Sequence, residues 1–310
     1  MLLTAETQDL QEQLSTLSSF IGNTPLFPIT RAYSKPGVKI YAKLEWQQLG
    51  GSVKARPAFR IIQDAVKSGQ LQPGQSLLDA SSGNTAIAYA AIGAAIQIPV
   101  TICLPENASE ERKTLLKAFG ANIVYTSRFG STDEAQEIAK QLYSDYPDRY
   151  FYADQYGNQS NWQAHYHTTA NEIFRQTKGE ITHFVAGLGT TGTFTGTSRK
   201  LKELNPEIEL ISLQPDAAMH GLEGWKHLET ARVPKIYDAT IANQNLAIDT
   251  YEAFDLIQKV AQKEGLLISP SAAANLAGAI KVADSIEEGV IVTVFPDNAE
   301  KYAEVLKSLF

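Results

Sequence analysis

Short apolar runs alternate with helical patterns through the middle of the sequence. The expected elements, in chain order, are a strand at Ser76–Ala80, an alanine-rich helix at Thr85–Ala95, a strand at Val100–Leu104, a helix capped at Asn107 and ending at Gly120, a strand at Ile123–Thr126, and a helix with Ala135, Ile138, Ala139 and Leu142 on one face. Strands separated by helices in this way predict right-handed βαβ units on a parallel sheet.

A similar alternation resumes after residue 180. The expected elements are a strand at His183–Ala186, a helix at Thr193–Leu204, a strand at Glu209–Leu213, a helix near Tyr251–Glu264, a short strand at Leu266–Ile268, a helix near Ala272–Ala283, a strand at Val290–Phe295 and a final helix at Ala299–Leu309. Two α/β lobes without a long linker are expected, with a cleft between them, where small ligands commonly bind.

Composition narrows the class of protein. The chain has 310 residues, 44% of them hydrophobic and 20% charged, which excludes a disordered chain. Its net charge of −7 argues against nucleic acid as the main partner, and no basic cluster favours a membrane surface. A single cysteine, Cys103, permits neither an intrachain disulfide nor a thiolate metal cage, and its apolar strand indicates a packing role.

The hydrophobic and charged residues of the sequence also do not form a recognisable targeting signal. The first residues carry Glu6, Asp9 and Glu12 where a signal peptide would have basic residues, and the apolar stretch from Ala86 to Leu104 is interrupted by Gln97 and Pro99. We therefore expect a cytoplasmic protein that does not span a membrane.

The first loop that could carry chemistry is Gly50-Gly51-Ser52-Val53-Lys54, at the start of an expected helix. A lysine in this position is most often a solvated surface residue. A helix N-terminus, however, repels an ammonium, and a lysine that loses its proton can form a Schiff base with an aldehyde.

The second loop, Ser81-Ser82-Gly83-Asn84-Thr85, lies between an expected strand and an expected helix. These small polar residues could simply cap the helix. The same geometry brings backbone N–H groups, hydroxyls and the helix dipole to one point, which suits a carboxylate or a phosphate.

The third loop, Gly187-Leu188-Gly189-Thr190-Thr191-Gly192-Thr193, again separates a strand from a helix. Its glycines let backbone amides approach an anion, and its threonines add hydroxyl donors. It lacks the Gly-Lys-Ser/Thr ending of a P-loop, and the dinucleotide interpretation of G-x-G-x-x-G finds no acid well placed at the end of the next strand. One aldehyde-binding lysine and two anion-binding loops match what pyridoxal phosphate bound to an amino acid requires.

Many collinear motifs carry a family resemblance. They are IGNTPL at Ile21–Leu26, KLE at Lys43–Glu45, GGSVKAR at Gly50–Arg56, SSGNT at Ser81–Thr85, LPENASEERK at Leu104–Lys113, DQYGN at Asp154–Asn158, AHYHTT at Ala164–Thr169, THFVAGLGTTGTFTG at Thr182–Gly196, LQPD at Leu213–Asp216 and TVFPD at Thr293–Asp297. On these residues the sequence resembles the pyridoxal-phosphate-dependent cysteine synthases (O-acetylserine sulfhydrylases), especially their B-type branch.

The resemblance implies an α/β fold of the fold-type II class, similar to the tryptophan synthase β subunit, with two lobes that are each a mostly parallel sheet wrapped by helices. It places the smaller lobe, with the substrate-carboxylate loop, at residues 48–158. The larger lobe, with the cofactor-phosphate loop, takes residues 1–47 and 159–310. A homodimer is also implied.

The resemblance further assigns site residues. Lys54 corresponds to the Schiff-base lysine, Asn84 to the partner of the cofactor's ring hydroxyl, and Ser271 to the partner of the pyridine nitrogen. The phosphate would be held by Gly189, Thr190, Thr191, Gly192 and Thr193, and the substrate carboxylate by Ser81, Ser82, Gly83, Thr85 and Gln155.

The implied reaction is a β-replacement on O-acetyl-L-serine or O-phospho-L-serine with sulfide or carrier-bound sulfur, giving L-cysteine through an α-aminoacrylate. Lys54 would act as the general base at Cα. Two alternatives stay open: another β-replacement or elimination on the same cofactor, such as cystathionine or lanthionine formation or cysteine desulfhydration, and a cofactor-binding regulatory pseudoenzyme.

The chain departs from the family pattern in its pocket. Ala55 stands where the family usually has aspartate, Ser81 replaces threonine, Ala86 replaces a glycine, and Pro270 and Ala272–Ala274 stand in a region that is usually rich in glycine and serine. These departures bear on rate and substrate choice. Lys226 could meet a substrate phosphate or be a solvated lysine, and no metal site is expected, because His165 and His167 would point apart on a helix.

Overall fold

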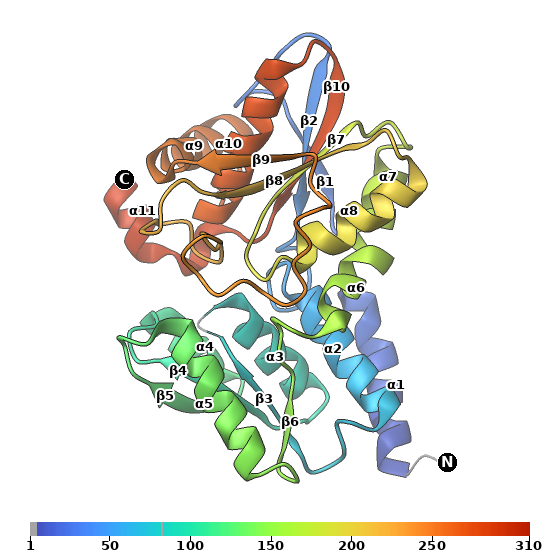
Figure 1. The fold of residues 1–310 in the computed structure, drawn as a ribbon, viewed down its shortest axis with the longest axis vertical. Helices are drawn as coiled ribbons and strands as arrows, with labels where there is room; N and C mark the ends of the chain where they lie inside the picture. The colour runs from blue at the N-terminus through green and yellow to red at the C-terminus, as the bar shows by residue number, and fades with distance from the viewer. Residues whose placement is uncertain (1–4, 82) are drawn as a thin grey trace. The chain divides into compact units, whose positions relative to one another are not determined.

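The computed structural model describes residues 5–81 and 83–310, and these divide into two compact units (Figure 1). Unit 1 comprises the described chain up to Gly22, together with Gln48–Gly50 and Lys54–Asn161. Unit 2 comprises Asn23–Gln47, Gly51–Val53 and Trp162–Phe310. The chain therefore passes between the units several times.

Unit 1 is built on a parallel sheet with the strand order β5-β4-β3-β6. Its elements are α1 (Ala5–Leu17), η1 (Ser18–Phe20), α2 (Ala55–Ser68), β3 (Ser76–Ala80), α3 (Asn84–Ala95), β4 (Val100–Pro105), α4 (Glu110–Ala118), β5 (Asn122–Thr126), α5 (Ser131–Asp145), β6 (Tyr150–Tyr152) and the start of α6 (Gln159–His167). Every residue of β3 and β4 is buried, as expected of central strands covered on both faces.

Neighbouring residues of β3 point to opposite faces of the sheet, and this alternation builds two cores. Leu77 belongs to the core formed with α1, α2 and α3, whereas Leu78 packs with Ala135 and Ala139 of α5. Cys103 is buried in the second of these cores, which confirms that its strand is apolar and packed.

Unit 2 is built on a six-stranded sheet with the order β1-β2-β10-β7-β8-β9, in which only β1 runs antiparallel to its neighbour. Its elements are β1 (Leu26–Ile29), β2 (Val38–Leu44), the rest of α6, α7 (Thr169–Gln176), β7 (His183–Gly187), α8 (Gly192–Leu204), β8 (Glu209–Pro215), β9 (Gln244–Ile248), α9 (Thr250–Glu264), α10 (Pro270–Ser285), β10 (Gly289–Phe295), η2 (Ala299–Lys301) and α11 (Ala303–Leu309). Two units of α/β architecture with mostly parallel sheets confirm the predicted fold class.

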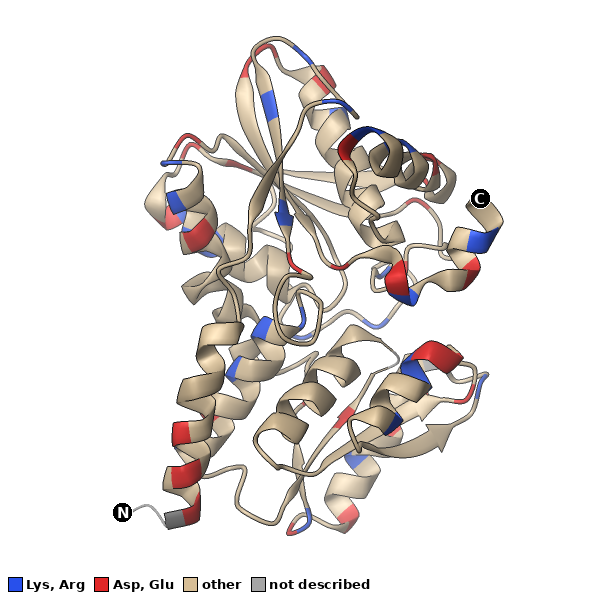
Figure 2. Ribbon diagram, turned by 180° about the vertical axis from the view of Figure 1, so that it is seen from behind, with Lys and Arg blue, Asp and Glu red and all other residues tan. Residues whose placement is uncertain are grey.

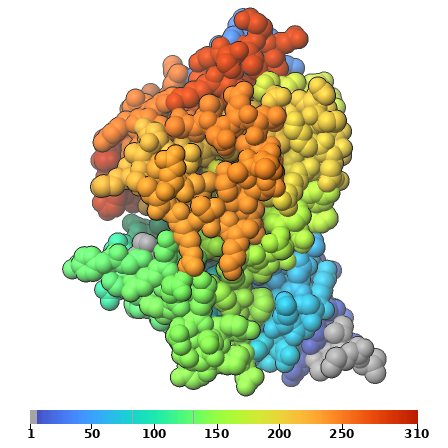
Figure 3. Space-filling model, viewed as in Figure 1, coloured from blue at the N-terminus to red at the C-terminus, as the bar shows by residue number. Residues whose placement is uncertain are grey.

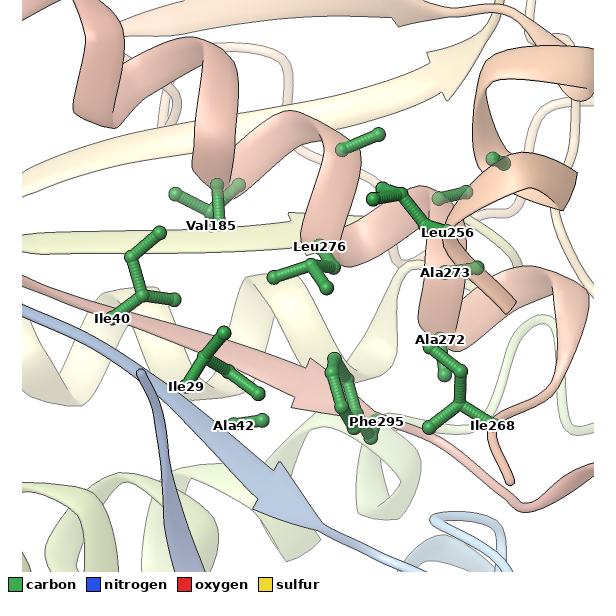
Figure 4. Packing of buried hydrophobic residues seen from close by; sticks show 14 of the residues in the cluster. Ile29, Ile40, Ala42, Val185, Leu256, Ile268, Ala272, Ala273, Leu276 and Phe295 are labelled. Atoms are coloured by element: carbon green, nitrogen blue, oxygen red, sulfur yellow. The ribbon is translucent and has the colours of Figure 1, made fainter. Parts of the chain in front are cut away.

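The α10 helix lies against one face of this sheet, and its apolar residues meet those of β2, β7 and β10 (Figure 4). Leu276 of α10 and Phe295 of β10 are fully buried there. The opposite face is covered by α7 and α8, where Phe194 stacks on Phe184 of β7 with ring centroids 6.2 Å apart. The sheet is thus a rigid platform covered on both faces.

Residues 216–243, between β8 and β9, form no helix or strand. This segment lies at the surface of unit 2, in yellow and orange in Figure 3, but four of its residues, Leu222, Trp225, Pro234 and Ile236, are buried. Leu222 and Trp225 belong to the core that α9 and α10 share with the sheet. The segment is therefore fixed to unit 2 by apolar packing.

Three expected boundaries were wrong. The expected strand Leu266–Ile268 does not form. Only Ile268 pairs, in a single β-bridge with Asn298, and one paired residue is too few for a strand. The expected helix at Ala299–Leu309 is divided into η2 and α11 at Tyr302, whose backbone is not helical and whose hydroxyl donates to Asp297. The helix α4 is capped at Ser109 instead of Asn107, because the Ser109 backbone is extended.

Charged residues of both signs are interspersed along the ribbon in the view of Figure 2. Among the described residues, no helix has both the length and the apolar character needed to cross a membrane.

Candidate active site

The glycine-rich loop of unit 2 joins the carboxyl end of β7 to the N-terminus of α8, as the sequence predicts. The helix begins at Gly192, and Thr191 precedes it in the left-handed region with φ 70°. In open α/β sheets, this edge of the sheet and this end of the helix are where anionic ligands bind.

Close packing explains why the loop contains glycines. A Cβ atom on Gly187 would lie 2.0 Å from the Trp225 ring, and one on Gly189 would lie 2.1 Å from the carbonyl oxygen of Gly224. The N–H of Lys226 also donates to the Leu188 carbonyl oxygen at 2.8 Å. Segment 216–243 therefore packs directly against the glycine-rich loop.

The hydroxyl of Thr191 is the observation that points to a ligand. This side chain is only 2% exposed, and its Oγ1 atom has no hydrogen-bond partner in the described part of the chain. A buried hydroxyl without a partner is costly unless a ligand supplies one. At the N-terminus of a 13-residue helix, a phosphate fits this requirement.

Side chains from three neighbouring elements support the same loop. Asn275 of α10 accepts a hydrogen bond from the Gly187 N–H at 2.7 Å and donates to the Val294 carbonyl oxygen at 2.7 Å. His165 of α6 lies 3.3 Å from Thr193 Oγ1 and 2.9 Å from Thr169 Oγ1. The role of Asn275 cannot be predicted from the sequence, because a single asparagine in an alanine-rich stretch forms no recognisable motif.

The two histidines of the AHYHTT motif point apart, as the sequence analysis expects. His165 is fully buried, whereas His167 is exposed. No group of three or more His, Cys, Asp or Glu residues with the geometry of a metal site occurs within residues 5–81 and 83–310.

Ser271 lies in the first turn of α10. The Ser269 side chain caps this helix by accepting from the Ala272 N–H at 3.2 Å, and the two serine hydroxyls are 3.2 Å apart. Pro270 occupies the first helical position, where its fixed φ is favourable. Ser271 is 5% exposed, so this helix start presents a neutral hydroxyl in a nearly dry environment.

In unit 1, Lys54 is the N-cap residue of α2. The helix continues through Ala55 and Arg56, which are both buried, and the Lys54 carbonyl oxygen accepts from the Ala58 N–H at 3.1 Å. The side chain is half-buried. A positively charged lysine is disfavoured at this end of a helix.

The 81–85 loop joins β3 to α3, with Gly83 as the N-cap of the helix. Ser81 Oγ accepts from the N–H groups of Gly83 and Ala86, both at 3.3 Å. Ser81 therefore caps the helix, which is one of the two roles that the sequence leaves open. The Ser81 hydroxyl proton remains available for donation to an acceptor. Asn84 begins α3, and Ser82 lies outside the described residues.

Gln155 follows β6 and is brought to the same loop. Its Oε1 atom accepts from the Thr85 hydroxyl at 2.7 Å, and its Nε2 atom donates to the Ala80 carbonyl oxygen at 2.9 Å. Ser81, Gly83, Thr85 and Gln155 thus come from two parts of the sequence but share one edge of the sheet of unit 1.

The IGNTPL and KLE motifs meet in a buried polar network of unit 2. Lys43 Nζ pairs with Glu172 at 2.7 Å and donates to the Thr24 carbonyl oxygen, and the Thr24 hydroxyl donates to Glu45 at 2.7 Å. Glu172 also accepts from the Asn23 N–H at 2.9 Å. These motifs therefore have a structural role at the start of the sheet.

Known proteins are similar to this chain over most of its length. The sequence profile described as "Pyridoxal-phosphate dependent enzyme" matches residues 17–297. The "Cysteine synthase" of Aquifex aeolicus (strain VF5) is 44% identical over 294 residues, which cover 93% of this chain and 90% of that protein. The "Cysteine synthase B" of Pseudomonas aeruginosa is 35% identical over 292 residues, with 94% and 96% covered.

Among solved structures, the cysteine synthase of Entamoeba histolytica superposes with a TM-score of 0.88 at 31% identity and covers 94% of both chains. The similarity therefore extends over nearly the whole sequence and the whole fold.

Proposed function

This chain belongs to the family of pyridoxal-phosphate dependent enzymes, and on that premise we propose which of its residues hold the cofactor and the substrate. The protein is a cysteine synthase that catalyses a β-replacement with this cofactor. When bound, pyridoxal 5′-phosphate supplies an electron sink that stabilises negative charge at the substrate Cα.

The cofactor phosphate is held by Gly189, Thr190, Thr191, Gly192 and Thr193. The observation that carries this assignment is the buried Thr191 hydroxyl, which has no partner among the described residues. Backbone N–H groups at the start of α8 add donors, and the helix dipole favours the negative charge.

Lys54 holds the cofactor aldehyde and, when the substrate amine takes its place, removes and returns the proton at Cα. The N-cap position of Lys54 supports this role, because a helix N-terminus favours the neutral amine that such a base needs. Asn84 binds the cofactor's ring hydroxyl. Ser271 would hold the ring nitrogen through its neutral, buried hydroxyl.

Ser81, Ser82, Gly83, Thr85 and Gln155 hold the substrate α-carboxylate. The Ser81 hydroxyl retains a proton to donate, and backbone N–H groups at the start of α3 face the same edge. The substrate is O-acetyl-L-serine or O-phospho-L-serine, and sulfide or carrier-bound sulfur is the nucleophile. The enzyme acts as a homodimer in the cytoplasm.

The central experiment is borohydride reduction of the holoenzyme followed by peptide mass spectrometry. The cofactor should be found on Lys54. The Lys54→Ala variant should lose cysteine formation from O-acetyl-L-serine and sulfide by about 10³-fold or more, since it removes both the covalent link and the base.

Lys67→Ala is the matched control, because Lys67 is an exposed lysine of the same helix. Cofactor attached to another lysine, or full activity of Lys54→Ala, would contradict the assignment. Parallel assays with O-acetyl-L-serine and O-phospho-L-serine, each with sulfide or homocysteine, identify the leaving group and separate cysteine formation from cystathionine formation.

A further inference from the structure

A fully buried acid, Asp79, lies in β3 directly before the 81–85 loop. Both of its carboxyl oxygens accept hydrogen bonds from backbone N–H groups. Oδ1 accepts from Ala80 at 2.8 Å and Oδ2 accepts from Gln155 at 3.2 Å. Asp79 therefore connects the end of β3 to the segment after β6.

The Gln155 side chain continues this connection to the loop. Gln155 Nε2 donates to the Ala80 carbonyl oxygen, and Gln155 Oε1 accepts from the Thr85 hydroxyl. Gln155 is thus fixed at its backbone by Asp79 and at its side chain by the loop. The turn that carries it is unusual, because Asp154 has φ 44° and its carbonyl oxygen accepts from Gly157 and Asn158.

Only a carboxyl group satisfies this geometry. Two N–H donors approach two different side-chain atoms, so both atoms must be acceptors. An asparagine at this position would turn its NH₂ group toward one of the two N–H donors, whichever way the amide is oriented. A buried donor would then lose its partner.

We propose that Asp79 is a positioning residue for the substrate α-carboxylate, and that its own negative charge opposes the binding of that carboxylate. The proposal rests on the proposed function, in which Ser81, Thr85 and Gln155 hold the carboxylate. Asp79 acts through Ala80 and Gln155 and does not itself touch the substrate.

The surroundings of Asp79 disfavour its charged form. The pKa of Asp79 is raised to about 7, mainly by burial and to a smaller extent by the nearby Asp154 carboxylate, whereas the hydrogen bonds from the Ala80 and Gln155 backbone oppose the shift. The titratable groups that face Asp79 are Tyr89 from α3, Cys103 from β4, Tyr152 from β6, and Asp154 and Tyr156 from the segment after β6. None of these five groups is a cation.

A second anion bound at the adjacent loop would disfavour ionisation of Asp79 still more. Because linkage is reciprocal, ionisation of Asp79 must weaken the binding of that anion. The affinity of the native enzyme for the substrate carboxylate should therefore decrease as the pH rises through the neutral range.

The test is the steady-state kinetics of the Asp79→Asn holoenzyme with O-acetyl-L-serine between pH 6 and pH 8. At pH 6, KM should be about tenfold higher than the native KM, while kcat stays within about threefold and cofactor content is unchanged, because one buried hydrogen bond in the carboxylate-binding loop is lost. The ratio of the variant KM to the native KM should fall about threefold or more toward pH 8, because only the native enzyme gains the opposing charge. Asp148→Asn, an exposed aspartate of the same unit, is the matched control and should match the native enzyme.

A second variant keeps the test decisive if Asp79→Asn folds poorly. Asp154→Asn removes a neighbouring carboxylate that raises the Asp79 pKa and keeps both N–H contacts to Asp79, so the midpoint of the KM change should move to lower pH. An unchanged KM and pH profile in Asp79→Asn, or an unmoved midpoint in Asp154→Asn, would overturn the proposal. If native enzyme with bound cofactor shows no response to O-acetyl-L-serine, the proposed function itself fails and this inference fails with it.

Discussion

The Asn275 side chain accepts a hydrogen bond from the Gly187 N–H at 2.7 Å, and its amide group simultaneously donates to the Val294 carbonyl oxygen. Asn275 is 2% exposed and belongs to α10, whereas Gly187 ends β7 and Val294 belongs to β10. One side chain therefore fixes the start of the glycine-rich loop to the neighbouring strand. This side chain thereby supports the loop that is proposed to hold the cofactor phosphate.

Asn275→Ala should weaken both the fold and the cofactor site. It leaves a buried N–H and a buried carbonyl oxygen without partners, which costs about 2–4 kcal/mol. Thermal unfolding of the holoenzyme and the rate of cofactor loss on dialysis measure the two effects. Asn171→Ala, at an exposed position in α7, should leave both unchanged.

Thr191→Val separates ligand binding from folding. The valine keeps the branched shape but removes a hydroxyl that has no partner among the described residues, so the apoprotein should be as stable as the native apoprotein. Affinity for pyridoxal phosphate should fall about tenfold, because a hydrogen bond to a charged phosphate is lost. Titration of the apoprotein, followed by visible absorbance, gives the dissociation constant.

Thr197→Val is the control for this change, because Thr197 is a second buried α8 threonine whose hydroxyl lacks a partner in the described chain. It lies farther along the helix and should leave the affinity unchanged. Equal affinity losses in the two variants would show that Thr191 has no specific contact with the cofactor.

The buried ion pair between Lys43 and Glu172 should be sensitive to the loss of one partner. Lys43→Met removes the cation that lies 2.7 Å from the buried Glu172 carboxylate and should lower the free energy of unfolding by about 3–5 kcal/mol. The double variant Lys43→Met/Glu172→Gln should regain part of this loss. Urea unfolding of the holoenzyme measures both, and equal stability of the two variants would argue against charge as the cause.

The raised pKa of Asp79 predicts a pH dependence of stability with a definite sign. Between the ordinary value near 3.8 and the folded value of about 7, the folded state binds more protons than the unfolded state. The contribution of this group is complete below pH 3.8 and is lost as the pH rises toward 7, at about 1.4 kcal/mol per pH unit.

This slope should be missing in Asp79→Asn. The difference in unfolding free energy between native and variant holoenzyme, measured from pH 5 to pH 8, should therefore change up to about pH 7 and then become constant. A difference that does not vary with pH would show that the folded pKa of Asp79 is normal.

Cys103 should resist alkylation in the folded protein. Burial, with a smaller effect of the nearby Asp79 carboxylate, raises the pKa of its thiol to about 12, so little reactive thiolate exists at pH 8. Iodoacetamide should label it only after unfolding in urea. Mass spectrometry gives a direct result, because Cys103 is the single cysteine of the chain.

Periodicity predicted most of the βαβ elements. The position of the first candidate loop at the start of a helix, and of the second and third loops between a strand and a helix, is confirmed. The predictions were wrong where the local structure depends on contacts between residues that are far apart in the sequence. Leu266–Ile268 has the composition of a strand, but the paired length is decided by the neighbouring chain at Asn298. Lys43 is polar in sequence, and its complete burial depends on Glu172, which is far away along the chain.

The same limit applies to the site. Lys54 and the Thr191 loop are visible as motifs, because their residue types and spacing are specific to a chemistry. The role of Asp79 cannot be predicted from a motif, because the usual interpretation of an acid at the end of an apolar strand is a solvent-exposed strand terminus. Only the two converging N–H groups, one of them from Gln155, reveal what it holds.

The pairing of β2 with β10 has a consequence for synthesis on the ribosome. Val38 is in register with Gly289, so the sheet of unit 2 stays incomplete until β10 has been translated. Lys54–Asn161, by contrast, supplies every strand of the other sheet from one continuous stretch. The nascent chain should therefore fold early the unit that carries the proposed carboxylate-binding loop, whereas β2 remains unpaired with β10, and in need of protection, until β10 emerges.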